Sequence, residues 1–421
     1  MLTTLSKKSF LNIFNQNNPT KKILLTLVIL FIFRFGNTIP LAGIDQEALK
    51  KSFLQMENRN AIMQIINMYS GGGASILTPF SLGIIPFINA SILVDLLTAI
   101  VPFLEKLQSE EGESGRKQLT FYKKVLTLIF AVIQSGFLIF YLKSYFYNTE
   151  LLNLGLTGLE LVTGSMLIVW LSNIIDNKGI GNGTSLVILT NIVVTLLSKD
   201  IISVNNFGSK TIFEIGFILV LMNLICISQT ARINIEVVSA RQLAYLENIE
   251  KNDLNNRKTL KVKENGLSIR LNQAGIFPII IASNLIPLTS YLTENLFSQF
   301  KFLNTLIYYL LIIGFNYFYT IVFWDPEKIS EQLRKASVSI VNITPGKETV
   351  SYLENVVRSS SIIGGIFLCG ILVLYDVVKQ LINGNLLNQI NISSLIIVVG
   401  VAYEIQKTIR ALYKNVLEDI T

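Results

Sequence analysis

The chain has 421 residues, of which 51% are hydrophobic and only 15% are charged, and its mean hydropathy is +0.53. Soluble proteins have about 25% charged residues. This composition, with long apolar runs from end to end, therefore excludes a soluble enzyme, a disulfide-stabilised scaffold and a disordered protein. The net charge of +7 is interpreted as basic loops on one side of a membrane rather than as nucleic-acid binding. The sequence predicts an all-α polytopic membrane protein.

The inventory of reactive side chains is small. Histidine is absent, and the two cysteines, Cys226 and Cys369, both lie in apolar runs. Catalytic triads and most metal sites rely on imidazole or on clustered thiolates. Residues 345–349 resemble the end of a phosphate-binding loop, but Val341 stands where that motif begins with glycine, so we interpret them as a turn. We expect no enzymatic activity, no metal and no cofactor.

Ten apolar segments are candidates for transmembrane helices, each of which needs about 20 residues to cross the hydrocarbon. In chain order they are residues 23–41, 76–100, 121–142, 154–174, 184–198, 211–230, 274–293, 303–324, 360–380 and 392–410. Because proline removes a backbone donor and clashes with the preceding turn, we expect Pro86 to kink or break the second helix.

The loops between these segments alternate in length and in basic content. The set that includes both chain ends holds most of the lysines and arginines, which places it on the cytoplasmic or stromal side. Two loops of this set, residues 231–271 and 325–358, are unusually long. They are either solvated loops or a docking surface for an anionic partner, and their basic residues alone do not distinguish lipid, RNA and protein. The first twenty residues have no apolar core or cleavage site, so we expect no targeting peptide.

Residues 59–73 form a short apolar segment followed by three glycines. Its apolar face contains Ile62, Ile65, Ile66 and Tyr69, and the glycines are Gly71, Gly72 and Gly73. The segment is too short to cross a bilayer. It is either a helix that lies on the membrane surface or a small helix that folds back between the spans.

Five motifs occur in a fixed order along the chain. They are Ser81–Ile92, Glu111–Arg116, Trp170 with Gly179–Gly183, Leu271–Pro278 and Pro345–Gly346. In these motifs, and over nearly its whole length, the chain resembles the SecY family, the channel subunit of the Sec protein translocase. The resemblance implies ten transmembrane helices in two inverted five-helix halves, residues 1–205 and 206–421, around a central pore.

The resemblance also assigns roles to individual residues. The plug that seals the pore would be the segment at residues 59–73. The apolar pore ring would consist of Ile84, Ile88, Ile188, Ile192, Ile280 and Ile397. The lateral gate, between the second and seventh spans, would include Asp95, Asn272, Gln273 and Asn284. The residues that dock the ribosome or SecA would be Arg241, Arg257, Lys258, Lys335, Thr344, Pro345, Gly346 and Lys347.

The implied function is protein translocation. The chain would be the central subunit of a channel that passes unfolded preproteins across the membrane and releases apolar segments sideways into the lipid. Its partners would be SecE-type and SecG-type small subunits, the motor ATPase SecA, the ribosome and membrane lipid, and not DNA. An apolar ring excludes water when empty and offers no hydrogen bonds to any particular sequence, which suits a channel for many substrates.

Two departures from the family pattern bear on these roles. Thr344 stands where the family commonly has arginine, which puts in doubt the contact assigned to that arginine. Asp95 stands where the family often has a neutral polar residue, and a carboxylate within a span is generally functional or paired.

Alternatives to this interpretation are a secondary transporter with inverted repeats and, with little support, a membrane-embedded hydrolase. A transporter needs charged or polar ligands near mid-membrane, for which Arg34 and Asp95 are nearly the only candidates. The richness in Ile, Asn and Lys is typical of an AT-rich genome. We therefore expect the thylakoid membrane of a plastid, with both termini in the stroma, and a bacterial plasma membrane is the alternative.

Overall fold

The fold was analysed in a computed structural model, which describes residues 19–57, 77–109, 112–198, 209–239, 266–272, 274–275, 277–282, 285, 301–382, 387 and 390–418. The chain forms two compact units. Unit 1 contains residues 1–206 together with 389–421, and unit 2 contains residues 207–388. The boundary at 206 lies next to the one predicted between the two halves, whereas the last helix packs with unit 1. The inverted relation of the two halves stays a prediction.

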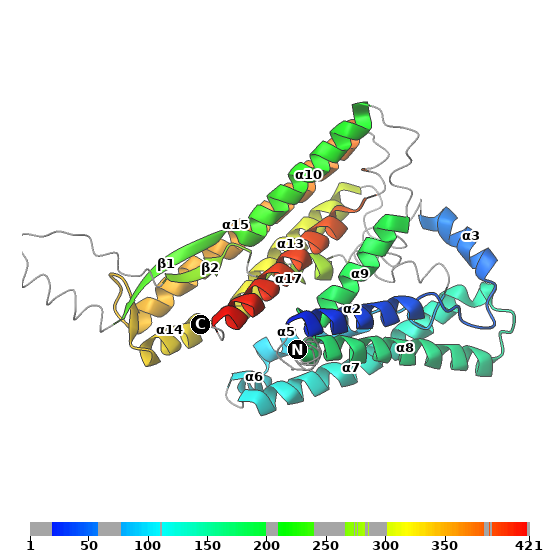
Figure 1. Cartoon of the computed structure of the whole chain (residues 1–421), viewed down its shortest axis with the longest axis horizontal. Helices are drawn as coiled ribbons and strands as arrows, with labels where there is room; N and C mark the ends of the chain where they lie inside the picture. The colour runs from blue at the N-terminus through cyan, green and yellow to red at the C-terminus, as the bar shows by residue number, and fades with distance from the viewer. Residues whose placement is uncertain are drawn as a thin grey trace, which may run out of the picture. The chain divides into compact units, whose positions relative to one another are not determined.

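Unit 1 is built from helices (Figure 1). They are α2 (Pro19–Gly36), α3 (Gln46–Glu57), α5 (Ile85–Ile100), α6 (Pro102–Ser109), α7 (Gly112–Leu142), the short 3-10 helix η1 (Lys143–Tyr145), α8 (Leu151–Lys178), α9 (Gly183–Ser198) and α17 (Ile392–Glu418). Helix α7 packs against α5 on one side and α8 on another, and α17 packs against α9 and α2.

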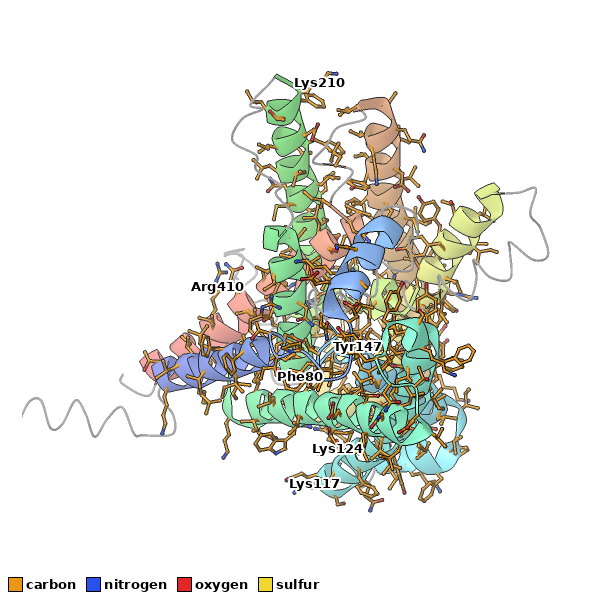
Figure 2. All side chains as sticks on the ribbon, turned by 90° about the vertical axis from the view of Figure 1, so that its right-hand side faces the viewer. Phe80, Lys117, Lys124, Tyr147, Lys210 and Arg410 are labelled. Atoms are coloured by element: carbon orange, nitrogen blue, oxygen red, sulfur yellow. The ribbon has the colours of Figure 1, made fainter. Side chains whose placement is uncertain are left out.

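Large apolar side chains of α7 point outward, and Lys117 and Lys124 project from its N-terminal part (Figure 2). Phe137 and Phe140 are 71% and 81% exposed. An apolar outer surface of this kind is suited to hydrocarbon rather than to water.

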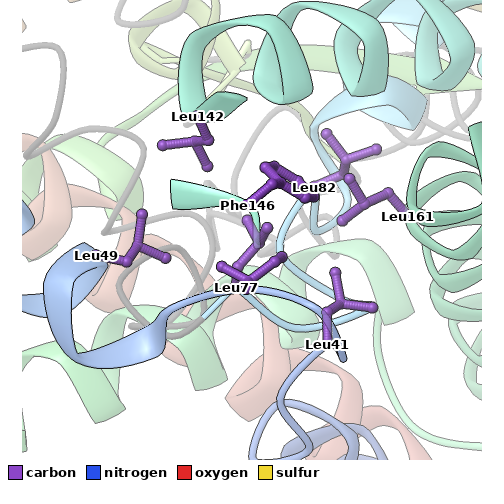
Figure 3. Packing of buried hydrophobic residues seen from close by; sticks show 8 residues of the cluster. Leu41, Leu49, Leu77, Leu82, Leu142, Phe146 and Leu161 are labelled. Carbon is purple, nitrogen blue, oxygen red and sulfur yellow. The ribbon is translucent and has the colours of Figure 1, made fainter. Parts of the chain in front are cut away.

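A leucine-rich cluster in unit 1 fixes the chain that precedes α5 (Figure 3). Its buried members are Leu41, Ile44, Leu49, Leu77, Leu82, Leu142, Phe146 and Leu161. They come from the loop after α2, from α3, from the turn at residues 77–84, from the end of α7 and the residue after η1, and from within α8. Burial of this apolar surface against several separate elements holds the turn before α5 in place.

Unit 2 combines helices with a small sheet. Its elements are α10 (Ser209–Thr230), β1 (Arg232–Ser239), β2 (Gly266–Arg270), a helical stretch at residues 277–282, α13 (Lys301–Phe323), α14 (Pro326–Lys335), β3 (Val338–Ile340) and α15 (Lys347–Ile382). Helix α15 packs against both α10 and α13, and α10 runs alongside it into the sheet (Figure 1).

The three strands are antiparallel in the order β2-β1-β3. Ile235 faces Leu267 across the first pair, and Val237 faces Ile340 across the second. The sheet packs on α14 and the first turns of α15 around Leu353, which is fully buried. The described parts of the two loops predicted at residues 231–271 and 325–358 therefore meet in one folded module of β1, β2, β3, α14 and the first turns of α15, called here the docking module after the role predicted for these loops.

The chain is mostly helical, but it also contains a three-stranded sheet. The prediction of an all-α fold is wrong in this respect. The alternation of Ile233, Ile235 and Val237 with the polar residues between them has the period of a half-buried strand.

Six helices of the described ranges are long and apolar enough to cross a membrane. They are Gly112–Tyr145, Leu151–Lys178, Lys210–Thr230, Thr305–Lys335, Lys347–Ile382 and Ile392–Leu412. A seventh candidate is the pair Ile85–Thr98 and Pro102–Gln108, which is bent by 105°. Ten spans stay a prediction.

The prediction that Pro86 kinks or breaks the second helix is wrong. Helix α5 begins at Ile85, after the turn, so Pro86 lies in its first turn. Proline is favoured there because the first backbone amides of a helix have no partner within it. The bend lies at the other end of α5, beside Pro102.

Candidate functional site

The side chains predicted to form the pore ring are all described and all buried. Five belong to unit 1: Ile84 is the N-cap of α5 and Ile88 follows it by one helical turn, α9 carries a pair one turn apart, and α17 carries one. The exposed fractions are 0% for Ile84, 5% for Ile88, 2% for Ile188, 0% for Ile192, 2% for Ile280 and 0% for Ile397. Ile280 belongs to unit 2. Their convergence on one constriction stays a prediction.

Two backbone amides of the glycine-rich turn between α8 and α9 donate hydrogen bonds to side chains of the adjoining helices α8 and α2. The amide of Gly183 donates to Asp176 Oδ1 at 2.7 Å, and the amide of Ile180 donates to Thr26 Oγ1 at 3.1 Å. A Cβ on Gly183 would lie 2.2 Å from the carbonyl oxygen of Ser172. The turn therefore joins the two helices closely and sets where α9, with its two ring isoleucines, begins.

Asp95, predicted in the lateral gate, forms an ion pair. Its Oδ1 lies 2.9 Å from Nζ of Lys123, which links α5 to α7, and the two side chains are 30% and 25% exposed. A carboxylate in a span is stable when it is paired. The pairing accounts for Asp95 without a substrate ligand.

The remaining gate residues are described in part. Asn272 is buried and its Nδ2 donates to the carbonyl oxygen of Gly275 at 3.0 Å. This bond closes the turn ahead of the helical stretch at 277–282. Gln273 and Asn284 lie outside the described residues, as does the predicted plug at residues 59–73.

An internal repeat, which the sequence interpretation missed, connects the two units. Residues 83–91 and 275–283 share the pattern Gly-Ile-x-Pro-x-Ile-x-Ala-Ser. In both copies the glycine has a left-handed backbone, with φ of 57° at Gly83 and 65° at Gly275, and helix begins two residues later. Ile88 and Ile280 occupy the same place in the two copies. A search of the sequence against itself could have found this repeat.

The tip of the docking module is organised by local hydrogen bonds. Thr344 Oγ1 donates to Glu348 Oε2 at 2.6 Å, and the Thr344 carbonyl accepts from Thr349 Oγ1 at 2.8 Å. Pro345 and Gly346 follow, and Gly346 has φ of 121°, which favours glycine. Helix α15 then begins at Lys347.

Charge in the docking module is mixed. Lys335 Nζ lies 2.9 Å from Glu331 Oε1. Residues 325–358 contain five acidic and five basic side chains, whereas residues 231–271 contain eight basic and five acidic ones. The second loop is therefore neutral, which corrects its interpretation as a basic surface.

A hollow of about 480 Å³ lies on the surface between α14 and the first turns of α15. It is lined by Glu327, Ser330, Glu331, Arg334, Gly346, Lys347, Val350, Ser351 and Glu354. Both signs of charge border it. Of the basic docking residues predicted in the first loop, Arg241, Arg257 and Lys258 lie outside the described ranges.

These features define a polytopic helical membrane protein with a folded module attached to its spans. Among solved structures, its fold is similar to one titled "The structure of a protein conducting channel", with a TM-score of 0.63 and 15% identity over 93% of this chain and 92% of that one. It is also similar to Sec61 in a canine ribosome-channel complex from the endoplasmic reticulum, with a TM-score of 0.56, 15% identity and the same coverage. At this identity the likeness concerns the fold alone.

The sequence comparisons define the family. The SecY family model matches residues 78–406. A "Protein translocase subunit SecY" from Pyropia yezoensis is 37% identical over 413 residues, which cover 94% of this chain and 96% of the relative. Another from Synechocystis is 32% identical over 433 residues, covering 96% and 94%. The chain belongs to the SecY family.

The resemblance inferred from the five motifs is thereby confirmed, and membership identifies the chain as a multi-pass subunit of a protein-conducting channel. The comparisons give the solute transporter no support.

Proposed function

We propose that unfolded preproteins pass through a ring formed by Ile84, Ile88, Ile188, Ile192, Ile280 and Ile397. The observation that carries this proposal is the internal repeat, which gives Ile88 and Ile280 equivalent places at the start of two separate helices. All six side chains are buried and apolar. Such a ring keeps water and ions out when empty and deforms around a chain without binding a particular sequence.

Photocrosslinking from the ring tests this proposal. A crosslinking amino acid at Ile88 or Ile192 is expected to capture a preprotein stalled in the channel. The matched control is Phe137 on α7, which is 71% exposed and faces outward, and which is expected to capture lipid instead. Equal preprotein capture from Phe137 and from the two ring positions would contradict the assignment.

The remaining elements of the channel are proposed on the family pattern. The segment at residues 59–73 is the plug, with Ile62, Ile65, Ile66, Tyr69, Gly71, Gly72 and Gly73. The lateral gate contains Asp95, Asn272, Gln273 and Asn284, and it releases apolar segments into lipid. The chain has ten spans in two inverted halves, and it needs SecE-type and SecG-type small subunits. It has no cofactor and catalyses no reaction of its own, so the driving force comes from partners.

The docking module is proposed to receive SecA or the ribosome. The surface consists of Arg241, Arg257, Lys258, Lys335, Thr344, Pro345, Gly346 and Lys347. The described parts of the module's two loops, which are far apart in the sequence, share one sheet and one apolar core, so a partner would meet a folded surface there. Two of the solved relatives in fold are ribosome-bound complexes, a canine Sec61 channel and a yeast Ssh1 complex.

Charge reversal in the first loop tests this surface. We expect the triple change Arg241→Glu, Arg257→Glu and Lys258→Glu to weaken ribosome binding by roughly tenfold or more at low salt. The salt dependence should also become shallower, because fewer counterions are released from RNA phosphates. Binding is measured by co-sedimentation over a range of salt concentrations, and SecA binding is measured in parallel. Lys117→Glu on α7 is the control, and unchanged affinity of the triple variant for both partners would contradict the proposal.

The compartment is proposed to be the thylakoid membrane of a plastid, with both termini in the stroma. Support comes from composition, from the basic loops and from relatives in Pyropia yezoensis and Synechocystis. The bacterial plasma membrane is the alternative.

A further inference from the structure

A glycine in α8 makes room for the backbone of the turn that precedes α5. A Cβ added to Gly164 would lie 2.0 Å from the carbonyl oxygen of Pro79, far inside van der Waals contact. The ring of Phe80, the next residue, packs against Gly36 of α2 and stacks on Phe33 with ring centroids 6.0 Å apart. The turn is therefore seated on two helices at once.

Unit 2 contains the same arrangement. A Cβ added to Gly364 of α15 would lie 2.3 Å from the carbonyl oxygen of Leu271. Leu271 lies four residues before Gly275, as Pro79 lies four residues before Gly83. In each unit, the carbonyl of the residue four positions before the first glycine of the repeat therefore packs against a glycine of another helix. This carbonyl is called here the seated carbonyl.

Short backbone hydrogen bonds also hold the chain on either side of the Pro79 carbonyl in unit 1 and at Leu271 in unit 2. In unit 1 the Leu41 amide donates to the Leu77 carbonyl at 2.9 Å, and the Gly83 amide donates to the Phe80 carbonyl at 2.8 Å. In unit 2 the Leu271 amide donates to the Ala231 carbonyl at 3.0 Å. Only five residues separate the Pro79 carbonyl from the start of α5, and five separate the Leu271 carbonyl from the helical stretch at residue 277, so a shift at either glycine is expected to be passed on to the helix that follows.

We propose that Gly164 and Gly364 are positioning residues that set the resting position of the helices beginning at Ile85 and at residue 277. This inference rests on the proposed function, in which these two helices border the lateral gate and carry Ile88 and Ile280. A side chain at either glycine must push the turn away from its seat, because the opposing atom is backbone and cannot rotate aside. The helix that follows then moves with the turn, and the closed state of the channel loses stability relative to the open one.

The alternative role of these glycines is close helix packing without control of the gate. Small residues commonly allow backbones to approach in membrane proteins. In that case alanine would lower the amount of folded channel, but the channels that do assemble would behave as wild type. The two roles predict different behaviour of the channels that do assemble, so the measurements are made per assembled channel.

The test uses the full channel with its partner subunits in liposomes, and four alanine variants. Gly164→Ala is compared with Gly155→Ala in the same helix α8, and Gly364→Ala is compared with Gly370→Ala in the same helix α15. Apart from its own helix backbone and chain neighbours, no atom of the described residues lies within 4 Å of a Cβ added to either control glycine. The assembled amount is measured first, then ion flux per assembled channel, then transport of a preprotein whose signal sequence has been removed.

We expect Gly164→Ala and Gly364→Ala to raise the ion flux per assembled channel by roughly tenfold, the size of effect that overpacking can exert on a two-state equilibrium. Both should also admit the preprotein without its signal, whereas Gly155→Ala and Gly370→Ala should match wild type. Wild-type flux and signal dependence in the assembled Gly164→Ala and Gly364→Ala channels would overturn the proposal, whatever their yield.

If Gly164→Ala does not assemble, Phe80→Leu decides the question. This change removes the ring packed on α2 and loosens the same turn without adding volume, so it is expected to raise the flux less strongly, and wild-type flux would overturn the proposal. Failure here is distinguishable from failure of the proposed pore, because photocrosslinking from Ile88 in the wild-type chain tests the pore independently.

Discussion

Replacing Ile88, Ile192 and Ile280 together with asparagine is expected to make the closed channel leak ions. All three side chains are at most 5% exposed, and none can form a hydrogen bond. If they line one constriction, water leaves it when no polypeptide is present, and ions meet the energetic barrier of wetting it. Three amides give water fixed hydrogen-bond partners and remove that barrier. We expect the ion flux to rise by a factor of roughly ten to a hundred, which corresponds to lowering the barrier to ion passage by a few kcal/mol.

The measurement is ion flux across liposomes that contain assembled channels, supported by single-channel recordings. The matched control replaces the same three isoleucines with valine, which keeps the surface apolar and costs about 0.5–1.5 kcal/mol per site through lost packing. If core packing were the only role of these residues, both triple variants would reduce assembly and neither would leak. A wild-type flux in assembled asparagine channels would refute the ring.

The helices of this chain could be predicted from sequence because each long apolar run has one dominant solution in a membrane. With no water available, the backbone must satisfy its own hydrogen bonds, and a helix does this within one segment. Described helices accordingly overlap all ten predicted segments, although residues 274–293 are described only in part. The start of α5 was placed too early, because the apolar residues before Gly83 form a turn packed in a leucine-rich cluster and not a helix.

The sheet was harder to predict because its strands come from two loops that are distant in sequence. The alternation in β1 is visible, but β3 has only three residues, Val338–Ile340, and it becomes a strand through its partner. Local patterns carry little information about such pairing. The neutral charge of the second loop could have been obtained by counting acidic as well as basic residues.

The candidate site could be predicted from sequence only through family resemblance. No property of Ile188 or Ile397 on its own distinguishes a pore residue from a packed one in a chain so rich in isoleucine. The internal repeat is the exception, since it marks Ile88 and Ile280 by position. The contact of Gly164 with the carbonyl of Pro79 required a structure, because close approach of two backbones leaves no signal in one sequence beyond a glycine.

The ion pair between Asp95 and Lys123 is expected to behave as a unit that joins α5 to α7. The two charged atoms lie 2.9 Å apart, and removing one partner leaves the other charge, on a side chain 25–30% exposed, without its counterion. Asp95→Leu or Lys123→Leu alone should lower the free energy of unfolding by about 1–3 kcal/mol, the range for hydrogen bonds to charged groups. The double change to leucine should recover most of this loss, because an apolar pair can replace a partly buried ion pair.

A double-mutant cycle measures this coupling through thermal unfolding of the purified complex. The matched control is the pair of Glu113 and Lys117 on α7, which has a similar separation of 2.8 Å but side chains 85% and 76% exposed. Solvent screening and side-chain entropy leave exposed pairs with little net stabilisation. The coupling of Asp95 with Lys123 should therefore exceed that of the control, and equal couplings would mean that the inner pair is solvated like a surface pair. If the inner pair couples strongly, the carboxylate of Asp95 serves to tether α5 to α7, and no substrate ligand is needed to explain it.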